Sequence, residues 1–242
     1  MLLLIPSAKQ MKLRDSGQPA ALFQNAQTVV AQLSVLDEAE LATCYKIKPT
    51  AAKVEWERWQ ALAQGTALSY PALNLFDGLM YRHIDRSSQA NWAYYRQHVK
   101  ITTALYGMIA CDTLIAPHRL DFMTKVQVND QSLKQYWRAQ YDASVAQSEL
   151  IVSLLSSEFE EVFSKAVRDR LVKVVFMEQH GSQLKTHSTI SKKARGQFMT
   201  AVAQQNVTTL AEIKQLTVGD FIYREALSTE RELVFVKTIA EE

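Results

Sequence analysis

Three cations, Lys192, Lys193 and Arg195, stand within four consecutive residues. Ser191 directly precedes them and is a residue type that caps helix N-termini, so the sequence predicts a helix that begins there and ends at Gln205. The cations would then lie in the first turn, where the helix dipole disfavours a positive charge by about 0.3–1 kcal/mol and favours an anion. Cations kept at such a position indicate a function, and with the free backbone N–H groups they predict a phosphate site. The alternative is a solvated helix start without a ligand.

Other side chains that could do acid–base or phosphate chemistry are scattered along the chain. Lys9 follows an apolar run, which favours a phosphate ligand or a desolvated amine; the alternative is an exposed lysine at a strand end. Two aspartates can act as general acid and general base, but no spacing selects a pair. The aspartates concerned are Asp77, Asp85, Asp112 and Asp121.

The potential metal ligands form no recognisable set. The five histidines are not spaced as ligands, and the two cysteines, Cys44 and Cys111, are too few for a disulfide framework or a complete zinc site. The sequence therefore predicts no metal and no cofactor.

The formal net charge of +2 hides an uneven distribution of charge along the chain. Residues 165–195 contain eight Lys and Arg against two acidic residues, whereas residues 211–242 contain seven acidic residues against four basic ones. Clustered basic charge attracts phosphates or acidic surfaces whatever the total charge. The alternative is that these residues form the solvated faces of ordinary helices and strands.

The composition is that of a globular protein, with 48% hydrophobic and 21% charged residues among 242. The apolar run from Leu2 to Ile5 stops at Pro6, which makes it too short for a signal peptide. No stretch approaches the ~18 apolar residues that would span a bilayer. We therefore expect a cytoplasmic protein that does not enter membranes, and favour a monomer.

The pattern of helices and strands predicts an α+β fold. Since no linker or repeat divides the chain, we expect one domain over residues 1–242, a mixed β-sheet surrounded by helices. The expected strands are 2–5, 150–155, a hairpin of 172–177 with 184–188, and 232–237. The expected helices are 19–33, 37–45, 50–63, 132–147, 191–205 and 210–216, with helical periodicity also over 88–105.

Several short motifs, taken in chain order, resemble the YaaA family of bacterial proteins associated with peroxide stress. The segment 192–196 matches the family's K-K-A-R-G, and Ser7-Ala8-Lys9 resembles the end of its first strand. The other matching segments are Leu105-Tyr106-Gly107, Pro117 to Asp121, Tyr136-Trp137, Ser156 to Phe159 and Glu232 to Phe235. These matches run from end to end of the chain, and their joint order carries the resemblance.

The chain departs from the family pattern at three places. Ala110-Cys111 stands where the family has Arg-Pro, which removes one cation from the expected cleft. His118 replaces a Tyr and Asp121 replaces a Glu. The chain is therefore identified as a divergent member, for which a shared fold is a firmer expectation than a shared activity.

The resemblance implies a DNA-binding protein with a basic cleft and a helix-hairpin-helix element, linked to lower free iron and less oxidative DNA damage. Five residues are then expected to contact phosphates: Lys9, Arg119, Lys192, Lys193 and Arg195. Six more are expected around the cleft: Ser7, Tyr106, Gly107, His118, Asp121 and Glu158. Tyr106 could stack on an unpaired base there.

The sequence offers two placements for a helix-hairpin-helix element. In one, Tyr106-Gly107 forms the hairpin after an apolar helix and Thr113 to Leu120 follows. In the other, Asp77-Gly78 forms the turn within residues 69–105. The alternative in either case is an ordinary helical turn.

Three functions fit these residues. The leading hypothesis is binding of DNA, double- or single-stranded, through backbone phosphates and with little sequence preference. The second is an enzyme acting on a nucleotide or another phosphorylated small molecule, with Glu158, Asp112 or Asp121 as the acid–base group. The third is an interaction protein whose basic face meets an acidic partner. A deep, closed pocket around Lys9 and Lys193 would favour the enzyme, and a long open groove would favour DNA.

Overall fold

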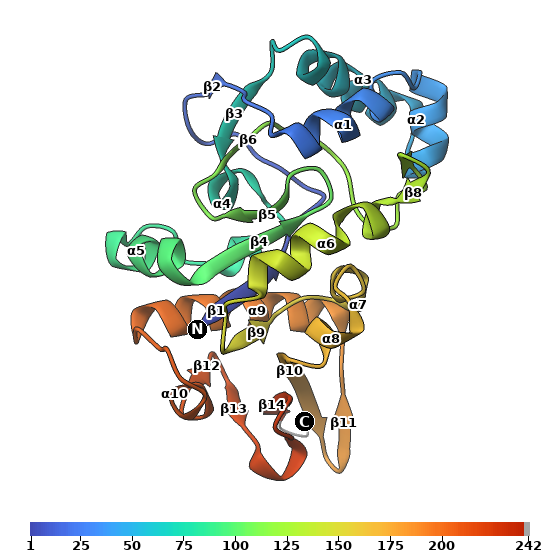
Figure 1. Cartoon of the computed structure of the whole chain (residues 1–242). Helices are drawn as coiled ribbons and strands as arrows, with labels where there is room; N and C mark the ends of the chain where they lie inside the picture. Colours follow the sequence, from blue (N-terminus) through green and yellow to red (C-terminus); the bar gives the residue numbers. More distant parts are fainter. Residues whose placement is uncertain (240–242) are drawn as a thin grey trace.

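A mixed sheet of nine strands runs through the molecule (Figure 1), in a computed structural model that describes residues 1–239. Five of its strands form a parallel centre: β1 (Leu2–Pro6), β4 (Val99–Thr103), β9 (Ile151–Ser153), β10 (Leu171–His180) and β14 (Glu232–Ile239). Four antiparallel strands complete it: β5 (Gly107–Ala110), β11 (Gln183–Lys185), β12 (Thr217–Val218) and β13 (Phe221–Tyr223). The strand order is β12-β13-β14-β10-β9-β1-β4-β5, and β11 pairs with β10.

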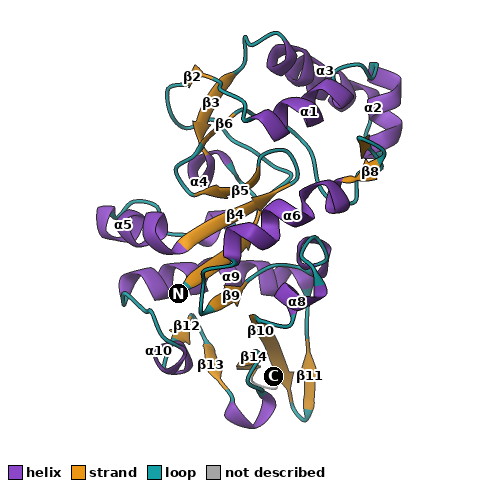
Figure 2. Ribbon diagram, in the orientation of Figure 1, coloured by secondary structure: helices purple, strands orange, loops and turns teal. Residues whose placement is uncertain are grey.

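Helices pack around the sheet, and α1 (Gln24–Leu33), α2 (Glu38–Tyr45) and α3 (Pro49–Ala63) lie beyond one end of it (Figure 2). The other longer helices are α5 (Gln89–His98), α6 (Leu133–Val145) and α9 (Ser188–Gln204). The short ones are α4 (Ala72–Leu75), α7 (Ser157–Glu160), α8 (Lys165–Arg168), α10 (Leu210–Lys214) and the 3-10 turns η1 (Tyr81–His83) and η2 (Glu225–Leu227). There are two smaller sheets in the described residues. One consists of β2 (Gln18–Pro19), β3 (Leu68–Pro71) and β6 (Leu114–Ile115), and the other of β7 (Gln127–Val128) and β8 (Gln131–Ser132). Helix α9 packs against β10, β12 and η1, and α6 against β5.

The first strand forms the middle of the sheet because its sequence is apolar on both faces. Leu3, Leu4 and Ile5 are all fully buried. Such a continuous apolar run is typical of a parallel strand covered on both sides. Strand β1 pairs with β4 on one edge and with β9 on the other, so it fixes the position of both.

The helix starts that the sequence marks are confirmed where a capping motif is present. Asp37 and Glu40 form a reciprocal capping box at the start of α2, and Pro49 is the first residue of α3. The strands predicted near residues 2–5, 150–155 and 232–237 and the hairpin of β10 and β11 are confirmed as well. The α+β class and the single compact domain are therefore confirmed for the described part of the chain.

The predicted start of the basic helix is wrong. Helix α9 begins at Ser188, with His187 as its N-cap, and the backbone N–H of Ser191 already donates to the carbonyl of His187 at 2.9 Å. Ser188 and Thr189 are residue types that also start helices, and the chain uses this earlier start. The three cations therefore lie in the second turn, where the dipole effect has faded, so the helix N-terminus does not add to a phosphate site at these side chains.

Two further expectations about helices are corrected. Helix α5 ends at His98, because the β-branched run that follows forms β4, which turns back at Gly107 into β5. The helix predicted from residue 19 starts at Gln24, because Pro19 pairs with Leu68 between β2 and β3.

The structure does not show a helix-hairpin-helix element at either predicted place. Tyr106-Gly107 belongs to the turn of a β-hairpin, and Thr113 to Leu120 is strand β6 and loop. Asp77-Gly78 lies between α4, which has four residues, and η1, which has three. In the described part of the chain, no helix is long and apolar enough to cross a membrane.

Candidate functional site

The order of the parallel strands leaves a crevice at the ends of β1 and β9. From β1 the chain passes to β4 on one side and later returns to β9 on the other side, with β10 beyond it. The connections after β1 and β9 therefore run in opposite directions over the sheet. In open sheets of this kind, the space outside the carboxyl ends of two such strands is where ligands bind.

A pocket of about 410 Å³ occupies this position, and we call it the strand-end pocket. One wall is the segment 6–10 after β1, and another is formed by Ser156, Glu158 and Phe159 after β9. Residues 78–81 and the pair Leu120 and Asp121 form two more sides. Helix α9 closes the pocket with Thr189, Lys192 and Arg195.

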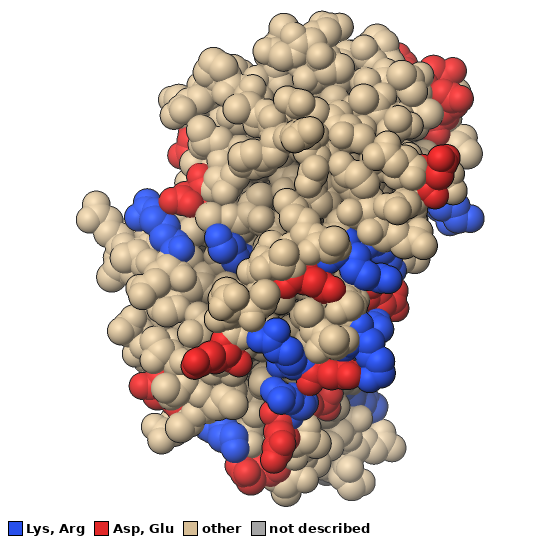
Figure 3. Space-filling model, viewed as in Figure 1, with Lys and Arg blue, Asp and Glu red and all other residues tan. Residues whose placement is uncertain are grey.

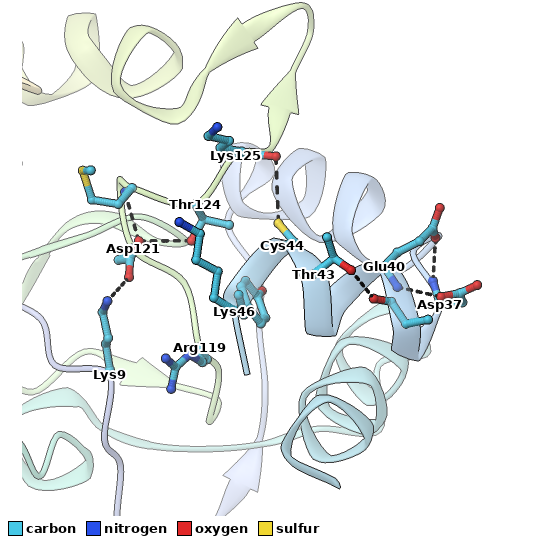
Figure 4. A pocket seen from close by; sticks show the side chains of 13 residues that line it. Lys9, Asp37, Glu40, Thr43, Cys44, Lys46, Arg119, Asp121, Thr124 and Lys125 are labelled. Atoms are coloured by element: carbon cyan, nitrogen blue, oxygen red, sulfur yellow. Dashed lines mark hydrogen bonds and ion pairs between the residues drawn. The ribbon is translucent and has the colours of Figure 1, made fainter. Parts of the chain in front are cut away.

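A wider pocket of about 830 Å³, which we call the outer pocket, adjoins the first (Figure 4). It lies between α2 and the segment 119–125, and Figure 4 shows Lys9, Lys46 and Arg119 around it from three different segments. Lys9 and Asp121 line both pockets. The two hollows therefore adjoin at these two side chains, and we call the pair of pockets the groove.

An ion pair forms the division between the pockets. The ammonium of Lys9 lies 2.6 Å from Asp121 Oδ2, and the lysine side chain is 54% exposed (Figure 4). Asp121 Oδ1 accepts hydrogen bonds from the backbone N–H of Met123 and the hydroxyl of Thr124. Burial alone would raise the pKa of Asp121, but Lys9 and these donors hold it below its usual value.

Glu158 lies in the strand-end pocket, where its surroundings raise the pKa of its carboxyl group rather than lower it. Burial first, and then the negative charge of Asp121, raises the pKa of Glu158, while Lys9 partly opposes them. Its Oε1 atom is shielded from solvent and has no hydrogen-bond partner among the described residues. Leaving such an acceptor unpaired costs about 1–3 kcal/mol, which a ligand could offset.

Arg195 is the matching unpaired donor. Its Nε atom is shielded from solvent and has no acceptor within residues 1–239. Burial lowers the pKa of Arg195, and Glu160 is the charge that opposes this effect. Glu160 is itself occupied, because it accepts from Ser153 at 2.8 Å and pairs with Lys173 at 2.6 Å. The guanidinium group therefore faces the pocket with unused hydrogen-bonding capacity.

The structure brings most of the expected phosphate and cleft residues together. The strand-end pocket contains Ser7, Lys9, Asp121, Glu158, Lys192 and Arg195, and the outer pocket adds Arg119. Lys193 is exposed on another face of α9 and is not among the residues lining either pocket.

Three expected cleft residues lie in the protein core. Tyr106 is 2% exposed, and its hydroxyl accepts the backbone N–H of Ala116 at 3.0 Å. His118 is equally buried, and burial lowers its pKa to about 4. Gly107 has φ of +72°, and a Cβ there would lie 2.7 Å from the ring of Trp137. These residues build the hairpin and its packing rather than either pocket wall, so no face of Tyr106 is open for a base to stack on.

Two cations of the outer pocket are not among the residues that the sequence predicts for the site. Lys46 and Lys125 line this pocket, but neither belongs to a motif that the sequence analysis used. Gly78 and Gly196 mark close approaches: a Cβ would lie 2.7 Å from the Cβ of Ala8 at the first and 2.7 Å from the Cβ of His83 at the second. Glycines at these positions are the one available hint that segment 78–81 and α9 meet.

Charges over the rest of the surface are mixed. On the face in Figure 3, basic and acidic side chains intermingle over the lower half, and the upper half is largely uncharged. Part of the basic run between residues 165 and 195 is paired, since Lys165 contacts Asp169 and Lys173 contacts Glu160. The local excess of positive charge is therefore smaller at the surface than along the sequence.

The thiols and the potential metal ligands suggest no separate site. Burial raises the pKa of Cys44, and it raises that of Cys111 to about 12, so both thiols stay protonated and unreactive near neutral pH. Within residues 1–239, no group of three or more His, Cys, Asp and Glu side chains is arranged to hold a metal ion.

Comparison with known proteins gives matches over almost the whole chain. The family model described as peroxide stress protein YaaA matches residues 1–227. A UPF0246 protein of Streptococcus gordonii is 48% identical over 242 residues, covering 99% of each chain. UPF0246 proteins of Streptococcus sanguinis and Streptococcus pneumoniae are 47% and 48% identical, covering 99% of this chain and all of theirs.

Proposed function

Because this chain belongs to the family of the peroxide stress protein YaaA, we propose that it binds DNA through backbone phosphates during peroxide stress. The phosphates would lie along the groove formed by the strand-end pocket and the outer pocket. We further propose that the protein acts as a monomer in the cytoplasm, where bacterial DNA is found.

The observation that carries this proposal is the set of cations along the groove. Separate segments of the chain contribute them, and they meet only in the folded protein: Lys9, Lys46, Arg119, Lys125, Lys192 and Arg195. Four acidic side chains share the groove, but three of these are already engaged. Asp121 pairs with Lys9, and the carboxylates of Asp37 and Glu40 each accept the backbone N–H of the other residue. Cations that face backbone phosphates bind without reading the sequence, which supports low sequence preference.

The test is the salt dependence of binding to a duplex. If all six cations contact phosphates, log K should fall with log salt at a slope of about −5. Replacing Lys192 and Arg195 together by Gln should weaken binding and reduce the slope by about 2.

The matched control is Lys193→Gln, which removes one positive charge from the same helix outside both pockets. We expect this variant to bind like the wild-type protein. A salt-independent affinity, or a loss in the Lys193 variant as large as in the double variant, would contradict the proposal.

A second candidate function uses the same pocket. Asp121 and Glu158 both line the strand-end pocket, and their surroundings lower the pKa of one and raise that of the other. Carboxyl pairs displaced in this way serve as base and acid in enzymes, which supports turnover of a phosphorylated small molecule. Incubation of the protein with a panel of nucleotides should then release products, and Asp121→Asn should abolish this release. If the protein converts none of the nucleotides, the result counts against catalysis.

A further inference from the structure

The strand-end pocket contains two unused hydrogen-bonding atoms of opposite character. Arg195 Nε is a donor and Glu158 Oε1 is an acceptor, and neither has a partner in the described part of the chain. Both residues line the pocket, so both atoms belong to side chains that a ligand there would contact. A ligand that satisfies both must offer an acceptor to the arginine and a donor to the glutamate.

A sugar phosphate meets this requirement. A phosphate group accepts hydrogen bonds from Arg and is attracted by the charge of Lys192, which lies one helical turn from Arg195 on α9. A carboxylate repels a phosphate but accepts hydrogen bonds from hydroxyl groups. In open parallel sheets, an acidic side chain near a strand end binds ribose hydroxyls in this way, while the phosphate lies at a helix N-terminus. Here the side chains of Lys192 and Arg195, in the second turn of α9, would hold the phosphate instead.

Apolar side chains against which a base can pack also line the pocket, with the polar residues Ser7, Gln10, Ser156 and Thr189 among them. The apolar ones are Pro6, Ala8, Leu79, Met80, Leu120 and Phe159. The volume of about 410 Å³ lies within the range of pockets that hold small organic ligands. The pocket thus combines a cationic side, an unpaired carboxyl group and an apolar wall.

We propose that the strand-end pocket binds a free ribonucleoside monophosphate. Lys192 and Arg195 hold the phosphate, Glu158 accepts a hydrogen bond from a ribose hydroxyl, and the base packs on the apolar wall. This inference rests on the phosphate site proposed above, since Lys192 and Arg195 serve in both, and it names the ligand class of the pocket. It requires neither DNA nor catalysis.

Calorimetric titration of the full chain tests this inference. The ligands are the four ribonucleoside monophosphates, the 2′,3′-dideoxy form of each, and the unphosphorylated nucleosides. We expect at least one ribonucleotide to bind, and its dideoxy form to bind about tenfold more weakly because Glu158 loses its donor. The corresponding nucleoside should also bind more weakly because it lacks the phosphate.

Two variants separate the roles of the side chains. Glu158→Ala should remove the preference for ribose over the dideoxy sugar, while Arg195→Gln should weaken every phosphorylated ligand and leave the nucleosides unchanged. Lys193→Gln serves as the control and should bind like the wild-type protein. Should Glu158→Ala fail to fold, Glu158→Gln keeps the shape and should still reduce the preference, because an amide is a weaker acceptor than a carboxylate.

Titration of the same samples with duplex DNA distinguishes failure of this inference from failure of the DNA proposal. Glu158→Ala should bind DNA at least as well as the wild-type protein, since it removes a negative charge. Absence of binding by any ribonucleotide to the folded wild-type protein would overturn the inference, even if DNA binds. A ribose preference that persists in Glu158→Ala and Glu158→Gln would overturn the role of Glu158.

Discussion

At the scale of single residues, Glu158 and Asp121 show how one pocket displaces two carboxyl groups in opposite directions. Burial and Asp121 raise the pKa of Glu158, so the folded state disfavours the ionised form. The contribution of Glu158 to stability is therefore largest below its ordinary pKa and is lost as pH rises through the folded-state value. We expect Glu158→Gln to melt above the wild-type protein near neutral pH, with the difference closing as pH falls toward about 4.

Asp121→Asn should change the melting temperature in the opposite direction to Glu158→Gln. The pKa of Asp121 is held low despite its burial, so its ionised form stabilises the fold above the ordinary pKa and this contribution is lost in acid. Asp121→Asn should melt below the wild-type protein at neutral pH. Melting curves over pH measure both effects. A Glu158→Gln variant without added stability at neutral pH would show that burial does not disfavour the ionised form of Glu158.

The site residues could be predicted in part because short motifs mark them. Lys9 is far in the sequence from Lys192 and Arg195, yet the motifs select all three and the structure places them around one pocket. Lys193 was grouped with them because a motif does not show which helix face a side chain occupies. Residues at i and i+3 share a face of a helix, so Lys192 and Arg195 point together and Lys193 points elsewhere.

At the scale of helices and strands, Gly196 lets α9 approach η1 closely. A Cβ at this position would collide with the backbone carbonyl of Met80 and lie 2.7 Å from the Cβ of His83. Helix propensity alone favours Ala over Gly by about 1 kcal/mol. We expect the collision to outweigh this gain, so that Gly196→Ala lowers the free energy of unfolding by about 1–3 kcal/mol, as measured by denaturant titration.

Ala201→Gly is the matched control for Gly196→Ala, because it changes propensity within the same helix in the reverse direction. It should destabilise the protein by about 1 kcal/mol. If Gly196→Ala instead stabilises the protein, the close approach of α9 to segment 78–81 is not rigid.

The start of a helix could be predicted where the sequence offers one clear start signal, and could not be where it offers several. The capping box of Asp37 and Glu40 is the one start signal near α2, whereas Ser188, Thr189 and Ser191 all offer a start for α9. The sequence predicts helical periodicity through the residues of β4 because α5 leads directly into this strand. Five strand residues are too few for a period of two to stand out from a helical period.

At the scale of the whole molecule, the site depends on long-range pairing that no local pattern encodes. Leu2 pairs with Ile151, and Leu3 pairs with Val99 on the other edge of β1. The strand runs themselves were predictable from their apolar residues, but their order in the sheet was not. That order creates the crevice at the ends of β1 and β9, and so the position of the site emerges only with the complete sheet.

The central claim is that phosphate groups bind at the carboxyl ends of β1 and β9. The most direct measurement is a crystal structure of the full chain with tungstate, a phosphate mimic whose anomalous signal marks its position. We predict an anion within hydrogen-bond distance of the Arg195 guanidinium, with Lys192 beside it. Anions bound only outside this groove, for instance beside Arg168 and Arg231, with the strand-end pocket free of anomalous signal, would contradict the claim.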